Sequence, residues 1–104
     1  MKLHEIKIKA EYYERVTSPH KHSRKTFEIR KNDRDYQEGD LVKFIVINDG
    51  TKDERAINIY NSNPILFKIT YVLKDIPAYG LQEGYCIFSI TPVKIQDYFT
   101  DEQR

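Results

Sequence analysis

Short segments in which apolar and polar residues alternate recur along the whole chain. The clearest is ILFKITYVLK, residues 65–74, where every second residue is apolar. The opening MKLHEIKIKA has the same period, and His4 falls in phase with its apolar positions. Successive side chains of a strand point to opposite faces, so this pattern is typical of half-buried β-strands. The sequence therefore predicts a mainly β fold built from short strands.

The remaining segments predict a small barrel with one helix. Residues 11–17 place Tyr12, Tyr13 and Val16 at helical spacings before Pro19 ends the helix. Asn48-Asp49-Gly50 predicts a hairpin turn between its two flanking strands. No strand–helix–strand repeat occurs, so we expect a closed or half-closed α+β barrel. The six expected strands are 4–10, 25–30, 41–48, 54–60 (ERAINIY), 65–74 and 85–90, the last ending near Pro92.

Length and composition predict one globular domain. The chain has 104 residues, of which 39% are hydrophobic and 32% charged, as in ordinary folded proteins. We expect the domain to span residues 1–97 and the polar residues 98–104 to form a frayed tail.

Cysteine usage and the lengths of the apolar segments favour a cytoplasmic protein. Its single cysteine, Cys86, lies within the apolar run YCIFSI and is expected to be a buried thiol. No segment has the length of a signal peptide's apolar core or of a membrane span. We therefore expect a soluble cytoplasmic monomer with no membrane partner.

Charge is unevenly distributed although the net charge is only +1. Residues 1–35 hold ten Lys or Arg against six acids, whereas the rest of the chain holds seven against ten. A low net charge argues against a protein that coats nucleic acid with its whole surface. The basic first third instead predicts a local surface that faces an anionic partner.

The densest cluster of charge lies between His20 and Tyr36. Glu28 and Arg30 stand two positions apart on one strand face, where a carboxylate can orient a guanidinium toward phosphate or a base edge. A structural ion pair on a solvated strand is an equally simple interpretation, as is a docking face for a protein partner. The cations of this cluster are Lys21, Arg24, Lys25, Arg30, Lys31 and Arg34.

Three blocks of this sequence resemble a known family. Lys25, Glu28 and Arg30 match the core of the G-x-K-x-x-E-x-R motif of the ASCH branch of the PUA-like superfamily, with Ser23 at the glycine position. HEIKI from His4, KTFEIRKNDRDYQEGD from Lys25 and GLQEGYCIFSI from Gly80 are similar to DUF3850, a family of small bacterial and phage proteins. The stretch 47–66 departs from that family's pattern.

The resemblance implies a PUA-like β-barrel with a cleft that binds RNA, nucleotides or nucleosides. Lys25, Glu28 and Arg30 would line the cleft, with Glu28 accepting from an exocyclic amine. Tyr36 or Tyr79 would stack on an unpaired base, and a packing role is the alternative for both. Further candidates are Arg24, Lys31 and Arg34 as flanking cations, and His4 as a cleft residue that is otherwise a core histidine.

The same superfamily includes small amidohydrolases that deacetylate N4-acetylcytidine with a lysine, a threonine and a glutamate. Lys25 matches the lysine, but Glu28 stands at the threonine position. The hydroxyl nucleophile is thus missing, and Thr26 would face the opposite side of the strand. A site of Lys25 and Glu28, with Glu54 or Glu83 as a base, would need water as its nucleophile.

Metal and cofactor sites are not predicted. His20-x-His22 lies in a loop without further ligands at the spacing that zinc requires. The chain also lacks a nucleophile elbow and a glycine-rich phosphate loop, so the sequence gives no indication of a protease or an NTPase.

Overall fold

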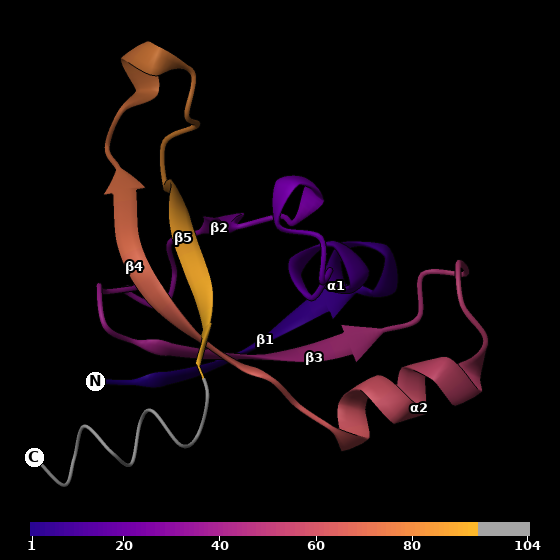
Figure 1. Cartoon of the computed structure of the whole chain (residues 1–104). Helices are drawn as coiled ribbons and strands as arrows, with labels where there is room; N and C mark the ends of the chain where they lie inside the picture. The colour runs from indigo at the N-terminus through magenta and orange to yellow at the C-terminus, as the bar shows by residue number, and fades with distance from the viewer. Residues whose placement is uncertain (94–104) are drawn as a thin grey trace, which may run out of the picture.

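A computed structural model describes residues 1–93 and places nine elements along the chain. They form a curled half-barrel sheet with two helices (Figure 1). The predicted frayed tail, 98–104, and the end of the predicted domain lie outside the described residues. The elements are β1 (Leu3–Lys9), α1 (Ala10–Val16), η1 (Lys21–Ser23), β2 (Phe27–Lys31), β3 (Leu41–Ile47), α2 (Glu54–Ser62), β4 (Leu66–Lys74), η2 (Pro77–Tyr79) and β5 (Tyr85–Val93).

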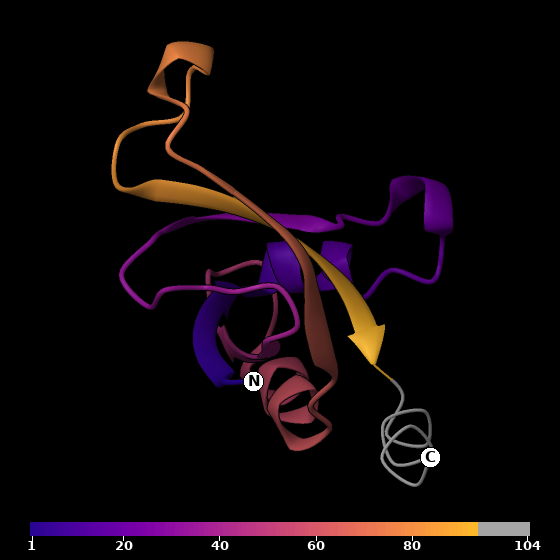
Figure 2. The same ribbon diagram turned by 90° about the vertical axis from the view of Figure 1, so that its left-hand side faces the viewer.

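The sheet has the order β1-β3-β4-β5-β2. β1 and β3 run parallel, whereas the pairs β3–β4, β4–β5 and β5–β2 are antiparallel. Thr70 is the extra residue of a bulge between Ile69 and Tyr71, where the register against β5 shifts. A bulge bends a strand and increases its twist. Seen along the sheet, the strands curl around the interior (Figure 2).

Alternating side chains fill the concave side of the sheet. The alternation predicted for β1 and β4 is confirmed, as is the strand predicted at β3: Ile6, Ile8 and Val42 are buried, and Phe44 packs edge-on against Phe67 with ring centroids 5.4 Å apart. Cys86 is a buried free thiol, as expected. The helix predicted at 11–17 is α1, and it adds Ala10, Tyr13 and Val16 to the core.

The segment ERAINIY is a helix, so the prediction of a sixth strand there is wrong. Asp53 caps α2 by accepting a hydrogen bond from the Ala56 amide at 2.9 Å, the usual role of Asp at a helix start. Asn48-Asp49-Gly50 accordingly leads into this helix and not into a hairpin. Asn61 of α2 then bonds both the amide and the carbonyl of Val46, at 2.8 and 3.0 Å.

β2 alternates as predicted, but its apolar side chains face outward and the side chain of Glu28 points into the fold. Phe27 and Ile29 are 44% and 56% exposed, whereas Glu28 is only 4% exposed. The interpretation of Glu28 and Arg30 as an ion pair on a solvated strand is therefore wrong for the carboxylate. A polar group is buried without large cost when its hydrogen bonds are satisfied, and Glu28 meets that condition.

Candidate functional site

The half-barrel is open between its two edge strands, β1 and β2, and a groove lies along this seam. We call it the seam groove. Its first compartment, of about 580 Å³, is lined by residues of β1, α1 and β2, including Lys9, Tyr12 and Lys25. Its second compartment, of about 500 Å³, reaches into the loop after β2. Lys7 and Arg30 line both compartments.

Glu28 holds the two cations of the predicted motif at the seam. Arg30 donates to one oxygen of Glu28 from Nε at 3.0 Å and from its terminal nitrogen at 2.7 Å, while the amine of Lys25 contacts the other oxygen. The side chain of Glu28 is 5% exposed, against 22% for Lys25 and 27% for Arg30. The carboxylate thus lies beneath two cations that face the groove, and both of its oxygens are engaged.

Lys25 has an unusual environment for an amine. Burial lowers its pKa to about 8, and the charge of Arg30 acts in the same direction. Contact with the Glu28 carboxylate opposes this by favouring the ammonium form. The nitrogen also lies 5.6 Å from the ring centroid of Tyr12 and 5.2 Å from that of Phe27, within cation–π distance of both.

The second compartment contains three more of the predicted residues: Lys31, Arg34 and Tyr36. Arg34 crosses the seam and donates to the backbone carbonyl of Glu5 on β1 at 2.5 Å. Tyr36 is 3% exposed and its ring lies between those of His4 and Phe88, with centroids 4.8 and 4.7 Å away. Its burial makes Tyr36 a wall of the groove and leaves no free ring face on which a base could stack.

His4 is a core residue that supports the loop after β2. Its Nε2 lies 2.8 Å from Asp40, and both side chains are 5% exposed. Asp40 also accepts hydrogen bonds from the amides of Lys2 and Gln37, at 3.0 and 3.1 Å. Burial by itself would raise the pKa of Asp40, but these hydrogen bonds outweigh it and lower the pKa. The alternative of a core histidine is the one that the geometry favours.

Several candidate residues lie away from the groove. Arg24 donates to the carbonyl of Ser18 at 2.6 Å and does not line either compartment. Tyr79 is 87% exposed in η2, at the tip of the β4–β5 hairpin, which projects from the rest of the fold (Figure 1). Glu54 begins α2 and Glu83 lies in the β4–β5 connection, and neither lines the compartment that contains Lys25.

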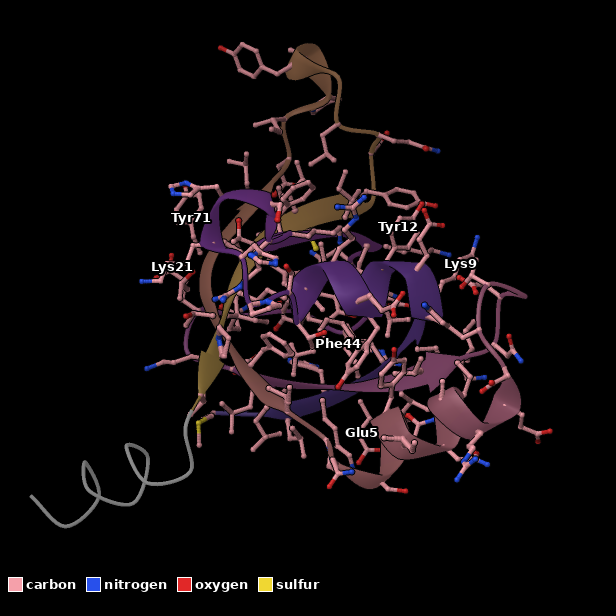
Figure 3. All side chains as sticks on the ribbon, turned by 45° about the vertical axis from the view of Figure 1, so that its right-hand side comes forward. Glu5, Lys9, Tyr12, Lys21, Phe44 and Tyr71 are labelled. Carbon is pink, nitrogen blue, oxygen red and sulfur yellow. The ribbon has the colours of Figure 1, made fainter. Side chains whose placement is uncertain are left out.

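Among the groove residues that sequence reasoning missed are two lysines and two aromatic residues of the first compartment: Lys7, Lys9, Tyr12 and Phe27. Tyr12 and Lys9 lie on the same side of the molecule in Figure 3. The polar phase of β1 was visible in the sequence, and it contains both lysines. What the sequence did not indicate is that β1 and β2, which do not pair, face each other across the seam.

Two other features are absent from residues 1–93. No group of three or more His, Cys, Asp or Glu side chains there has an arrangement that could hold a metal ion. None of the helices in that range is both long and apolar enough to cross a membrane.

Comparison with known proteins identifies the family of the chain. No curated protein matches the chain. The family model of DUF3850, a domain of unknown function, matches residues 3–90, which include both edge strands and the whole of the seam groove lining. The match spans most of the chain, and the protein therefore belongs to the DUF3850 family.

Proposed function

We propose that the protein is a PUA-like module of the ASCH type that binds RNA or nucleotides in the seam groove. The observation that carries the proposal is the charge of the groove. Its first compartment has four cations, Lys7, Lys9, Lys25 and Arg30, against the single carboxylate of Glu28. Cations that converge on a groove with partly exposed aromatic rings are the features that bind single-stranded nucleic acid.

In this proposal Glu28 orients the two cations that contact the ligand. Because both of its oxygens are engaged by Lys25 and Arg30, its role is to fix the direction of these two cations. A guanidinium held in this way keeps its remaining N–H groups in a fixed geometry for phosphate. The direct contact between Glu28 and an exocyclic amine that the resemblance implied would require one of these ion pairs to open.

The proposal is tested by fluorescence anisotropy with a labelled single-stranded RNA at two salt concentrations. Lys7→Ala should weaken binding about fivefold and reduce the slope of log affinity against log salt by about one, because one phosphate contact is lost. Lys68→Ala is the matched control, since Lys68 is an exposed lysine of β4 outside both compartments. Equal effects of the two substitutions, or no binding by the wild type, would contradict the proposal.

Lys25 provides the one observation that favours a second function, an amidohydrolase acting on an N4-acylated cytidine. An amine whose pKa is about 8 can take up and release a proton near neutral pH, and here it contacts a buried carboxylate. Water would be the nucleophile, because none of the groove-lining residues within 1–93 is a serine, threonine or cysteine.

This alternative is tested by incubating the pure protein with N4-acetylcytidine and measuring acetate by NMR. Turnover that Lys25→Met abolishes while the far-UV circular dichroism is unchanged would support the hydrolase. Nucleoside recovered intact at stoichiometric enzyme would exclude this substrate. An RNA complex that forms under the same conditions would then leave binding as the activity of the groove.

A further inference from the structure

The backbone of β2 presents hydrogen-bonding groups to the seam that are not used in the sheet. The carbonyl of Thr26 accepts from the Ile90 amide at 2.9 Å, and the amide of Asn32 donates to the Gly84 carbonyl at 2.8 Å. In an antiparallel pair, the residues that bond across the ladder alternate with residues whose N–H and C=O point away. The even-numbered residues of β2 therefore bond to β5. The peptide groups that point away from β5, toward the seam, are those of Phe27, Ile29 and Lys31.

β1 presents a matching row from the other side. The amide of Leu41 donates to the Lys2 carbonyl at 2.8 Å, so the even-numbered residues of β1 bond to β3. The peptide groups of Glu5, Lys7 and Lys9 consequently point away from β3. Two side-chain contacts agree with these directions. Arg34 reaches the carbonyl of Glu5, and Lys25 reaches that of Phe27 at 2.7 Å.

Two aromatic rings border the same compartment. Tyr12 of α1 and Phe27 of β2 are 46% and 44% exposed, and both line the first compartment. Each ring lies within 6 Å of the Lys25 amine, so the rings flank one cation at one place in the groove. The compartment that these rings border is also lined by Ile29, whose peptide group points away from β5.

We infer that the first compartment binds one unpaired nucleobase and recognises its edge through the backbone of β2. This inference rests on the proposed function, and it names the chemical class of the ligand at that site. The base lies against Tyr12 or Phe27, and its edge bonds to the N–H and C=O of Ile29, which form an adjacent donor and acceptor. Bases in a duplex have their faces stacked and their pairing edges engaged, so the ligand is a single strand.

The first test uses the ligand. A labelled single-stranded RNA of eight nucleotides, the same strand annealed to its complement, and an abasic strand of equal length are compared by anisotropy. The single strand should bind at least about tenfold more tightly than either of the others, since stacking of one base on an aromatic ring contributes on that scale. Equal affinity for the abasic strand would overturn the inference.

The second test uses the protein. Tyr12→Leu and Phe27→Leu should each weaken binding of the intact strand about tenfold and leave the weaker binding of the abasic strand unchanged. Tyr71→Leu is the matched control, because Tyr71 is 56% exposed on β4 and outside the groove lining. If Lys7→Ala weakens binding while both leucine variants bind as the wild type does, the nucleic-acid groove stands and the base site is wrong.

The backbone contact is tested at Ile29. Ile29→Pro removes an N–H that points away from β5 and leaves the ladder bonds of β2 in place, the setting in which an edge strand tolerates proline. It should weaken binding of the intact strand more than Ile29→Ala, which keeps the N–H. Equal affinities of these two folded variants would overturn backbone recognition, and the leucine variants decide the base site if the proline variant does not fold. Binding of an extended acidic peptide with no binding of RNA would overturn both proposals.

Discussion

Glu28 and Asp40 are both carboxylates with 4% exposure, yet the partners of Asp40 are buried and those of Glu28 are partly exposed. The partners of Asp40 are a 5% exposed histidine and two backbone amides, so its hydrogen bonds are directed into the fold. The partners of Glu28 are two cations with 22% and 27% of their side chains exposed at a groove. The difference teaches that the burial of an acid does not by itself describe its environment, because these two equally buried acids differ in the exposure of their partners.

The largest effect is expected at Asp40. Asp40→Ala should lower the free energy of unfolding by about 3 kcal/mol, because His4 and two amides lose a buried acceptor. Urea denaturation measures this, with Glu38→Ala as the control, an exposed acid of the same loop whose loss should change stability by less than about 0.5 kcal/mol. RNA affinity of the folded Asp40→Ala protein should remain within twofold of the wild type. A large loss of affinity at unchanged stability would reverse the comparison.

Asp40 should also give the protein an acid-sensitive component of stability. Its pKa is lowered in the folded state, so its contribution is complete above the ordinary value of 3.8 and is lost as the pH falls through the folded value. The stability difference between the wild type and Asp40→Asn should therefore shrink as the pH is lowered from 6 toward 3. A stability difference that stays constant over this range would show that the charge of Asp40 does not contribute to the stability of the fold.

Glu28 is expected to affect both stability and binding. Glu28→Gln should lower the free energy of unfolding by about 1–2 kcal/mol, because the charge-assisted hydrogen bonds are replaced by neutral ones. It should also weaken RNA binding, since Lys25 and Arg30 lose the group that orients them. Denaturation and anisotropy on the same samples measure the two effects. If stability falls and RNA affinity does not, Glu28 has a structural role like that of Asp40, and RNA binding in the groove does not require it.

A smaller effect is expected from pH at the groove. With a pKa of about 8, Lys25 is protonated below that pH and loses its charge as the pH rises through it. RNA affinity should therefore fall a few-fold between pH 7 and 9, and Lys25→Arg should bind equally at both values because arginine remains charged. A wild type with no loss of affinity up to pH 9 would mean that the contact with Glu28 keeps the amine protonated.

The smallest effect is expected for an ion pair outside both sites. Lys52 lies 3.1 Å from Glu14, and both side chains are 38% exposed. Solvent screens such a pair, so Lys52→Ala should change the free energy of unfolding by less than about 0.5 kcal/mol and leave RNA affinity unchanged. Glu14 also accepts from the Tyr60 hydroxyl at 2.8 Å, a contact that this variant keeps. An effect as large as that of Glu28→Gln would remove the distinction between buried and exposed ion pairs.

Local patterns predicted most of the strands because their physical basis is local. Period-two alternation placed β1, β2 and β4 within a few residues of their bounds, and β-branched or apolar runs bounded by turn residues did the same for β3 and β5. It failed at Glu54–Ser62, where Ile57 and Ile59 also alternate, but only Ile57 is buried. The signal for the helix was Asp53, an N-cap residue at its start. Propensity in so short a segment is weak, and packing of Tyr60 against Tyr13, with centroids 5.1 Å apart, helps to hold α2 in place.

The sequence by itself determined the alternating faces of the strands, the buried thiol of Cys86 and the grouping of Lys25, Glu28 and Arg30 in one short segment, since each depends on neighbours within a few positions. Only the tertiary structure decided which face of β2 points inward. It also decided that Tyr36 packs in the core, and that Lys7, Lys9 and Tyr12 lie across the groove from Lys25. These outcomes depend on the order of the strands in the sheet and on its curvature, which bring β1 and β2 together without pairing them. No periodicity within a single segment contains that information.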